Sequence, residues 1–465
     1  MGGPSDHFAG DPYRNADGIR RVVREGLCHR CGACIGLCPV GTFTIRDGYP
    51  YPVGECIRCN ICVRVCSGLE VDYPALGRLV HGEGYRFGPL TGPTRSVWIA
   101  HATDRAIRAG GASGGVATGA LAHWLRRGEI RGAIVTAADP NEPARGTGFV
   151  ARTVEELGRT QQSRYTTAPS FAALAQIRDE DGPFAAVGLP CQIHSLRKRQ
   201  AMDPRWISRV PIVIGLLCHY NLPWEVVRLT AELFAPPGAH PVRCFSRQKD
   251  DRGWPCNTME IHYSDGSVRR SPFSPAATFN VISRVAPLGR CLFCFDACAE
   301  FADFSVGDPW IRGPDGRWKY HSSEGFTLVF IQTEQGERLW RRLLEEGAIE
   351  GFQIPFEEFL ENGQRDMIVE KKERTALRVR VCRALGRPVP RYPVALPRTS
   401  PRQLVRELLF WVTRLNTVSQ RWQRLLLRIG FGPLGQWLLR RREQGRERVA
   451  RRRAQRKAGA AAPRR

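Results

Sequence analysis

The fold of the first part of the chain is decided by two cysteine runs, Cys28-His-Arg-Cys31-Gly-Ala-Cys34-Ile-Gly-Leu-Cys38 and Cys56-Ile-Arg-Cys59-Asn-Ile-Cys62-Val-Arg-Val-Cys66. Both have the spacing C-x2-C-x2-C-x3-C, and together they hold eight of the 16 cysteines. Three thiols at this spacing share one tight loop, and the fourth begins a helix that leads away from it. The repeat therefore predicts two copies of one loop, each with a fourth thiol that reaches its neighbour.

This spacing is typical of bacterial ferredoxins, whose thiolates hold two four-iron clusters in a crossed arrangement. It predicts a two-cluster ferredoxin-like domain over residues 18–78. The ligands of one cluster are Cys28, Cys31, Cys34 and Cys66, and those of the second are Cys56, Cys59, Cys62 and Cys38. Zinc is the alternative, because paired CxxC motifs also bind zinc, but four cysteines in each run exceed the needs of one tetrahedral ion.

One position departs from the ferredoxin pattern. Pro39 follows the last cysteine of the first run and redirects the chain, whereas Ser67 follows Cys66 in the second run. Gly32 fits the pattern, because a residue without a side chain lets the backbone approach a cluster closely. The departure concerns mainly the geometry around Cys66.

Positive charge is concentrated at the end of the chain. The 465 residues include 69 Lys and Arg against 45 Asp and Glu, a net charge of +24. Residues 371–465 alone hold 27 basic and 4 acidic residues, so the rest of the chain is close to neutral. This distribution argues against nucleic-acid binding over the whole protein. No base-reading motif supports specific nucleic-acid binding by the tail either.

The chain has neither a membrane span nor a secretory signal that the sequence reveals. No apolar stretch approaches the ~20 residues needed to cross a bilayer, and the first residues lack an apolar signal segment. We therefore expect reduced cysteines in a cytoplasmic protein, which the basic tail could bring to the inner face of the membrane.

Four later cysteines could form a third metal site. Short apolar runs that predict buried strands end at Cys191 and at Cys218. Open α/β sheets bind ligands where such strands end, and Cys291-Leu-Phe-Cys294 supplies a CxxC pair from a later loop. The alternative is that these cysteines are small buried hydrophobic side chains. Spacing alone leaves both interpretations open.

The middle of the chain alternates predicted strands and helices, as an α/β domain does. Gly110-Gly-Ala-Ser-Gly-Gly115 runs into an apolar helix over 116–125, and backbone N–H groups at such a helix start can bind phosphate. The stretch matches neither GxGxxG nor a P-loop, so close packing is the simpler explanation. The patterns predict strands at 97–100, 132–138 and 325–333, helices at 170–178 and 337–346, and a hairpin of 258–263 with 267–271.

These middle segments resemble the beta subunits of coenzyme F-420 hydrogenases and dehydrogenases, a family that includes 7-hydroxymethyl chlorophyll a reductase. Six segments carry the resemblance, in the family's order, over about residues 95–365. They are Ser113-Gly-Gly-Val-Ala-Thr118, Ser163-Arg-Tyr-Thr-Thr-Ala-Pro169, Gly188-Leu-Pro-Cys-Gln-Ile193, Gly215-Leu-Leu-Cys218, Arg290-Cys-Leu-Phe-Cys-Phe-Asp296 and Ala299-Glu-Phe-Ala-Asp-Phe-Ser-Val-Gly-Asp308. The resemblance implies an α/β flavin and iron–sulfur domain over residues 95–368.

The resemblance also implies cofactors and their ligands. It implies a flavin, usually FAD with FMN as the alternative, beside a third four-iron cluster. The implied cluster ligands are Cys191, Cys218, Cys291 and Cys294. The implied flavin contacts are Ser113, Gly114, Gly115 and Thr118, with Ser163 and Tyr165 as additional contacts. Cys298 matches no family ligand, and no residue is assigned as a catalytic acid.

Three functions from different classes follow from these patterns. The leading hypothesis is an iron–sulfur flavoprotein that passes electrons from a low-potential ferredoxin-like donor to a flavin, which reduces a small organic substrate. The second is an electron-transfer subunit of a larger hydrogenase or dehydrogenase that uses a deazaflavin coenzyme. The third is a non-enzymatic scaffold at a membrane surface. The direction of electron flow stays open.

The basic tail, residues 369–465, contains a predicted amphipathic helix over 404–429. At 100° per residue, one face carries Arg406, Arg414, Arg421, Arg424 and Arg428. The opposite face carries Leu404, Leu408, Val412, Leu415, Trp422 and Leu426. Such a helix binds a membrane surface or docks on protein, and both interpretations stay open. Residues 440–465 are expected to be disordered. The predicted fold class is thus a multidomain α+β and α/β chain with a basic helical or disordered tail.

Overall fold

A mixed sheet of eight strands forms the centre of the molecule. The computed structural model describes residues 18–441, apart from 89, 250–253, 255–257, 274, 287, 316 and 415–419, together with residues 444, 445 and 448. The strand order is β13-β3-β12-β11-β7-β6-β4-β5. The strands are β3 Ser96–Ala102, β4 Ala133–Ala138, β5 Gly146–Ala151, β6 Ala185–Gly188, β7 Ile212–Leu216, β11 Phe304–Gly307, β12 Thr327–Ile331 and β13 Ile349–Ile354.

The middle of this sheet is parallel and its flanks are antiparallel. Strands β4, β6, β7 and β11 pair in parallel, with Val187 opposite Ile214 and Val306 opposite Leu216. The remaining strands pair antiparallel to their neighbours. Parallel strands covered on both faces are apolar throughout rather than alternating, and β7 has that pattern. The mixed α/β class predicted from the sequence is therefore confirmed.

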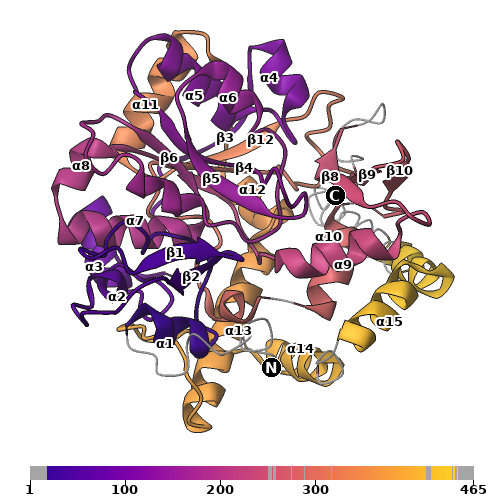
Figure 1. The fold of residues 1–465 in the computed structure, drawn as a ribbon. Helices are drawn as coiled ribbons and strands as arrows, with labels where there is room; N and C mark the ends of the chain where they lie inside the picture. Colours follow the sequence, from indigo (N-terminus) through magenta and orange to yellow (C-terminus); the bar gives the residue numbers. More distant parts are fainter. Residues whose placement is uncertain are drawn as a thin grey trace, which may run out of the picture.

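Helices cover both faces of the sheet (Figure 1). On one face, α5 (Val116–Arg126) and α11 (Glu334–Glu345) pack in a core with Ile212 and Ile214. On the other, α7 (Pro190–Met202) and α13 (Arg365–Ala384) pack in a core with Val213. Successive strand residues point to opposite faces, which is why β7 contributes to both cores. The remaining sheet-side elements are α4 Arg105–Gly110, α6 Val154–Gly158, α8 Arg205–Arg209, α12 Phe356–Asn362, and the 3-10 helices η2 Ser170–Ala175 and η3 Gly289–Phe293.

Several expected elements differ in detail. The helix expected over 170–178 is the shorter 3-10 helix η2. The expected hairpin is present, as β9 (Thr258–Tyr263) paired with β10 (Val268–Arg270), and β8 (Pro241–Gln248) completes a three-stranded sheet. The expected domain boundary between 368 and 369 falls inside α13, whose Ala376 and Val379 lie in the core of the body. The body thus continues past that boundary.

The cysteine-rich front segment lies against α7 and η2 (Figure 1). It consists of α1 Ile19–Arg24, β1 Phe43–Arg46, β2 Tyr49–Pro52, α2 Ile61–Arg64 and α3 Tyr73–His81, with β1 and β2 antiparallel. The N–H of Phe171 donates to the carbonyl of Cys31 at 2.9 Å. Gly32 has φ +79°, and a Cβ there would lie 2.6 Å from the backbone nitrogen of Ala172. The front segment therefore meets the body backbone to backbone.

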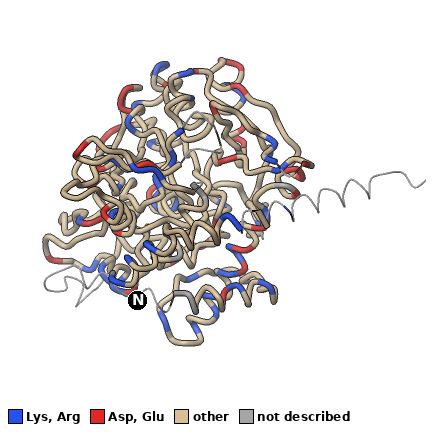
Figure 2. The backbone as a smooth tube through the Cα atoms, turned by 90° about the vertical axis from the view of Figure 1, so that its right-hand side faces the viewer, with Lys and Arg blue, Asp and Glu red and all other residues tan. Residues whose placement is uncertain are grey.

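Helices α9 (Trp224–Leu233), α10 (Pro275–Val285) and α15 (Gln420–Phe431) pack beside the three-stranded sheet. Helix α14 (Pro401–Arg414) lies next to α13. The helix expected over 404–429 is thus represented by α14 and α15, while residues 415–419 lie outside the described residues. Most of residues 440–465 also lie outside them. Along the traced backbone, Lys and Arg are interspersed with Asp and Glu over the body (Figure 2). No helix in the described ranges combines the length and the apolar character needed to traverse a bilayer.

Helix α14 turns its polar side toward the body. Glu407 is 3% exposed, and its two carboxylate oxygens accept from Arg378 Nε and Arg374 Nε, each at 2.6 Å. The ring of Phe410 lies beneath both guanidinium groups. Arg406 extends the contact by donating to Glu370 Oε2 at 2.6 Å. Buried charges that are paired in this way hold α14 in one orientation.

Glu407→Ala should release α14 from the body. It leaves Arg374 and Arg378 without their buried carboxylate, which costs about 3–5 kcal/mol. Hydrogen exchange at the α14 amides should accelerate by at least 100-fold, since each 1.4 kcal/mol of opening free energy changes exchange tenfold. Glu373→Ala is the control, because the Glu373 carboxylate also contacts the start of α14, through the N–H and hydroxyl of Ser400, but forms no ion pair among the described residues. Equal acceleration in both variants would contradict the prediction.

Glu300 should make stability fall as the pH rises. Burial raises the pKa of this carboxyl to about 7, with a further contribution from Asp296, and Tyr85 donates to it at 3.0 Å. Between pH 4.5 and 7 the folded chain keeps a proton that the unfolded chain has lost, so unfolding becomes easier as pH increases. From pH 5.5 to 7.5 the loss should be about 2 kcal/mol. The midpoint of urea unfolding, measured across this pH range, should fall with pH in the wild-type chain and stay level in Glu300→Gln. An equal fall in both would contradict the assignment of this pH dependence to Glu300.

Candidate functional site

The two cysteine runs adopt the same backbone conformation at matching positions. Arg30 and Arg58 occupy the residue before the second cysteine of each run, with φ of 59° and 58°. Gly32 and Asn60 occupy the residue after it, with φ of 79° and 60°. Non-glycine residues rarely take positive φ. Successive N–H groups in such turns form concavities of the kind that bind anionic iron–sulfur groups, so both loops fit a cluster.

Cys66 of the second run lies close to thiols of the first run. Burial raises the pKa of Cys28, and the nearby Cys31 and Cys66 raise it further. Cys34 has a raised pKa for the same reasons. Cys66, from the second run, thus lies among the first three cysteines of the first run. Metal binding needs the thiolate form, and an iron cluster would supply the positive charge that this buried set lacks.

The second set is less enclosed. Burial raises the pKa of Cys62 to about 11, and Cys56 and Cys59 lie close enough to add to it. Cys38 packs in the same cluster of side chains as Cys62. Burial raises the pKa of Cys38, but hydrogen bonds led by Thr42 outweigh that effect and lower it. Cys59 is exposed, so this set is the one nearest to solvent.

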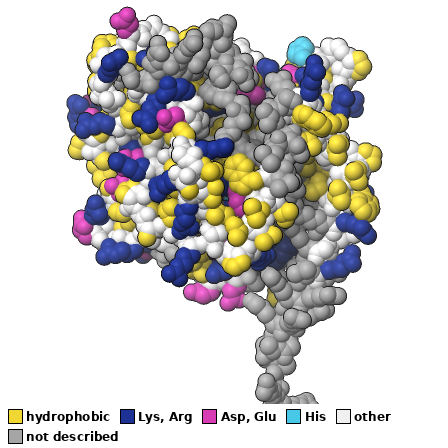
Figure 3. All heavy atoms as spheres, turned by 90° about the horizontal axis from the view of Figure 1, so that it is seen from below, with side chains coloured by type: hydrophobic (Ala, Val, Ile, Leu, Met, Phe, Trp, Pro, Cys, Tyr) yellow, Lys and Arg dark blue, Asp and Glu magenta, His cyan; other side chains and the backbone are white. Residues whose placement is uncertain are grey.

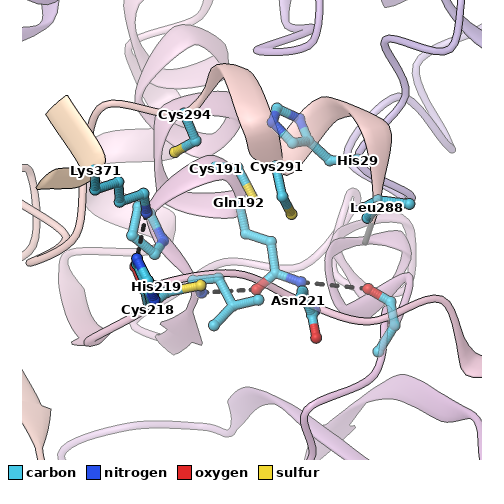
Figure 4. Close-up of a pocket in the computed structure, with 13 residues that line it drawn as sticks. His29, Cys191, Gln192, Cys218, His219, Asn221, Leu288, Cys291, Cys294 and Lys371 are labelled. Atoms are coloured by element: carbon cyan, nitrogen blue, oxygen red, sulfur yellow. Dashed lines mark hydrogen bonds between the residues drawn. The ribbon is translucent and has the colours of Figure 1, made fainter. Parts of the chain in front are cut away.

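The four later cysteines come together in one cavity (Figure 4). Cys191 opens α7 just after β6, and Cys218 follows β7. Because these parallel strands end at one edge of the sheet, their cysteines meet there. Cys291 of η3 and Cys294 close the cavity from the other side. Spacing alone left this grouping open, and the tertiary structure brings the four thiols together.

The chemistry of this cavity fits a cluster with four thiolate ligands. Burial raises the pKa of Cys218 to about 12 and that of Cys291 to about 11. The ammonium of Lys371 lines the cavity and donates to the carbonyl of Cys218 at 2.7 Å. Among the described residues, no three His, Cys, Asp or Glu side chains are arranged to hold a metal ion. A four-iron cluster does not need its ligands to converge on one ion, because each of the four thiolates binds a separate iron atom.

Ser67 connects the front segment to this cavity. Its hydroxyl donates to the carbonyl of Cys191 at 2.8 Å, and its N–H donates to Ser195 Oγ at 3.3 Å. His29, from the first run, lines the same cavity, and Cys31 lies near enough to Cys191 to raise its pKa. The position that departs from the ferredoxin pattern is therefore the docking contact between the first and third thiol sets.

Ser67→Pro should weaken this docking contact. It removes both donors, so the Cys191 carbonyl loses the Ser67 hydroxyl and Ser195 Oγ loses the Ser67 N–H. Each lost hydrogen bond costs about 0.5–1.5 kcal/mol. When electrons enter at the front segment, the cofactors bound in the body should be reduced more slowly. Stopped-flow absorbance measures that rate. Ser67→Ala keeps the N–H donor and should have the smaller effect. Identical rates in the two variants and the wild-type chain would contradict this role.

A second cavity, of about 920 Å³, lies beside the first. Such a volume suits a nucleotide-sized ligand. Five of the six expected flavin contacts line it: Ser113, Gly115, Thr118, Ser163 and Tyr165. Gly114 does not. Its N–H donates to Thr327 Oγ1 at 3.0 Å, and a Cβ would lie 2.7 Å from the carbonyl oxygen of Ala100, so it packs on the sheet instead.

Asp308 is the polar centre of this cavity. It follows β11, at the same strand edge as the cysteines. Its carboxylate accepts from Ser113 Oγ, from Arg247 at 2.5 Å and from Trp254 Nε1 at 3.1 Å. Arg247 and Trp254 are buried. The sequence pattern assigned no role to Arg247 or Trp254, because they come from a different part of the chain and meet Asp308 only in three dimensions.

Several buried polar atoms that line the large cavity have no hydrogen-bond partner among the residues that the structure describes. They are Gln162 Oε1, Arg164 Nε and His219 Nε2. Burial lowers the pKa of His219 to about 3, so the imidazole is neutral. Native proteins pair nearly all such atoms, so these three fit a site that binds a polar ligand. A flavin with its phosphates would supply partners of this kind.

The two cavities share a wall. Both are lined by Ala168, Leu189, Gln192, Cys218, His219 and Asn221. One residue layer thus separates the space among the four thiols from the large cavity. A one-electron carrier in the first and a two-electron carrier in the second would be near neighbours.

Family comparison agrees with this architecture. Two family models match the chain, and they describe the N-terminal and C-terminal parts of the beta subunits of coenzyme F420 hydrogenase/dehydrogenase. The first matches residues 97–175 and the second matches residues 182–355, which together make up more than half of the chain. The chain belongs to this family. It is therefore an iron–sulfur oxidoreductase of the F420 hydrogenase beta type, and the resemblance found in the sequence is confirmed.

Similar proteins occur in species of Methanosarcina and Methanocaldococcus. The chain is 26% identical over 348 residues to the F subunit of the F(420)H(2) dehydrogenase of Methanosarcina mazei, across 71% of this chain and 86% of the relative. It is 26% identical to the coenzyme F420-dependent sulfite reductase of Methanocaldococcus jannaschii, across 71% of this chain and 48% of the relative. A chain in the F420-reducing NiFe hydrogenase complex from Methanosarcina barkeri superposes with a TM-score of 0.51 at 23% identity, across 67% of this chain and all of the other. That last likeness concerns the fold.

Proposed function

We propose that this chain is an electron-transfer subunit that exchanges a hydride with a deazaflavin coenzyme of the F420 type. A bound flavin takes up two electrons as a hydride equivalent, and four-iron clusters carry them onward singly. The shared wall between the thiol cavity and the large cavity supports the proposal, because a cluster in the first cavity and a flavin in the second would be adjacent.

The thiol sets support a single path through the chain. The large cavity adjoins Cys218 of the thiol cavity. Cys191 of the thiol cavity lies near Cys31 of the first cysteine run. Cys34 of the first run lies near Cys62 of the second run. The path would run from the flavin through three four-iron clusters to the exposed end at Cys59. The ligand sets are those expected from the sequence. Residues 18–78 would bind two clusters, and residues 95–384 would bind one cluster and the flavin.

The residues of the large cavity would hold the flavin and keep water away. Asp308 keeps Arg247 and Ser113 in place at the cavity wall. The glycine-rich segment before α5 offers backbone N–H groups at a helix start, which suits phosphate. FAD is the form that the family resemblance implies, and FMN is the alternative.

The relatives favour a subunit of a larger assembly over a self-contained reductase. Their names describe F420-dependent dehydrogenase and hydrogenase subunits and a longer sulfite reductase. We therefore place the second hypothesis from the sequence before the first, with a ferredoxin-like carrier or a separate catalytic chain as the partner at the front segment. Reduction of another small organic substrate is the weaker hypothesis.

Turnover with an artificial partner tests this function. The chain is purified without oxygen, and reduced F420 is added with benzyl viologen as a one-electron acceptor. We expect recovery of the 420 nm absorbance with two viologens reduced for each coenzyme oxidised, and no turnover after flavin removal. A chain loaded with iron and flavin that neither oxidises reduced F420 nor reduces F420 from dithionite-reduced viologen would overturn the proposal.

A further inference from the structure

The outward side of α14 is apolar. Leu404, Val405 and Leu408 are 45%, 57% and 59% exposed. Their spacing puts them on one face of the helix. The face toward the body is instead the polar one, held by Glu407 between two buried arginines. Amphipathic helices of soluble proteins normally bury the apolar face, so the orientation of α14 is the reverse of the usual one.

Helix α15 and the helical segment 433–441 continue this apolar surface. Leu427 and Phe431 of α15 pack inward, whereas Leu425 and Ile429 are exposed on its outer side. Leu434, Trp437 and Leu438 follow on the helical segment 433–441, each more than half exposed. We call these eight outward residues the C-terminal apolar face: Leu404, Val405, Leu408, Leu425, Ile429, Leu434, Trp437 and Leu438.

Arginines accompany this face and acidic residues do not. Residues 401–441 contain eight arginines and one acidic residue, Glu407, which is buried. Arg421, Arg424 and Arg428 are exposed along α15, and Arg441 lies over the Trp437 ring at 4.6 Å. Seen from the side on which α14 and α15 lie in Figure 1, hydrophobic side chains gather beside Lys and Arg (Figure 3). Residues 442–465 add ten basic residues and two acidic ones.

We propose that the C-terminal apolar face binds the surface of an anionic lipid bilayer. Exposed Leu and Trp would enter the boundary between headgroups and acyl chains, while arginines on the same elements contact lipid phosphates. The polybasic sequence that follows at residue 442 adds long-range attraction to anionic headgroups. A second copy of this chain would bring the same arginines to the contact, where like charges repel, whereas anionic headgroups would pair with them. Charge complementarity thus selects anionic lipid over a second copy.

Flotation with vesicles tests this surface on the full chain with its cofactors. Vesicles of phosphatidylcholine with 30% phosphatidylglycerol are compared with phosphatidylcholine alone. We expect at least tenfold tighter binding to the anionic vesicles, weakened by 0.5 M salt because exposed charges are screened. Leu404→Gln/Leu408→Gln should weaken binding at least tenfold, and Arg424→Gln/Arg428→Gln should remove most of the preference for anionic lipid.

A matched variant and a measurement of size separate the alternatives. Val242→Gln/Val268→Gln changes two similarly exposed aliphatic residues on β8 and β10 and should leave binding unchanged. All variants alter exposed side chains and should keep wild-type iron content and F420 turnover. Light scattering shows whether the face joins two copies instead. No vesicle binding, binding insensitive to Leu404 and Leu408, or a dimer abolished by those substitutions would each overturn the proposal.

Discussion

Cys218→Ser should disconnect the large cavity from the front segment. The chain should lose one four-iron cluster, so iron falls from about twelve to about eight per chain. Cys218 is the thiol that lines both cavities, so a flavin should still bind while its exchange of electrons with the front clusters stops. Iron analysis and stopped-flow absorbance after mixing with dithionite-reduced ferredoxin measure the two effects.

Cys298→Ser is the matched control for that experiment. Cys298 is fully buried, whereas Cys218 is partly exposed, and Cys298 lies four residues after Cys294 without lining the thiol cavity. It should keep the full iron content and the wild-type rate. If Cys298→Ser lost four irons and Cys218→Ser did not, the assignment of the third ligand set would be wrong. If both retained twelve, Cys218 would not be a ligand.

Asp308→Ala should empty the large cavity. The substitution removes the carboxylate that Ser113, Arg247 and Trp254 share, so the buried guanidinium of Arg247 loses its ion pair with Asp308. Breaking such a buried pair costs about 3–5 kcal/mol. We expect flavin affinity to fall by at least 100-fold, measured by fluorescence of released flavin, while the eight cysteines of the front segment still bind iron.

Two substitutions control for charge and for position. Asp308→Asn retains the shape of the side chain and should fall between the wild type and Asp308→Ala. Asp315→Asn removes an exposed carboxylate shortly after β11 and should change nothing, because its partner Arg317 is also exposed. A wild-type flavin affinity in Asp308→Ala would show that the large cavity is not the flavin site.

The cysteine arrangement was predictable where it is local. Both runs carry their spacing within a few residues, and their loops repeat the same positive φ values at Arg30 and Arg58. Cys191 and Cys218 were predictable as residues at strand ends, because the apolar runs before them mark β6 and β7. Their meeting with Cys291 and Cys294 was not, since it depends on how a distant loop folds back over the sheet edge.

The role of Ser67 illustrates the same limit. In the sequence it is a departure from a pattern, whereas in the fold it bonds the carbonyl of Cys191, more than 120 residues away. The pairing of Asp308 with Arg247 is equally remote, because it joins the end of β11 to β8. Hydrogen bonds of this kind depend on positions in space that no local spacing encodes.

Helix α14 shows most clearly what each level decides. The sequence by itself determined a helix with an apolar and a basic side, predicted over 404–429, because helical period and residue type are local properties. Only the tertiary structure decided which side faces the body. Arg374 and Arg378 on α13 are buried and need a carboxylate, so Glu407 turns inward. The apolar side faces outward as a consequence, since pairing two buried charges outweighs covering Leu404 and Leu408.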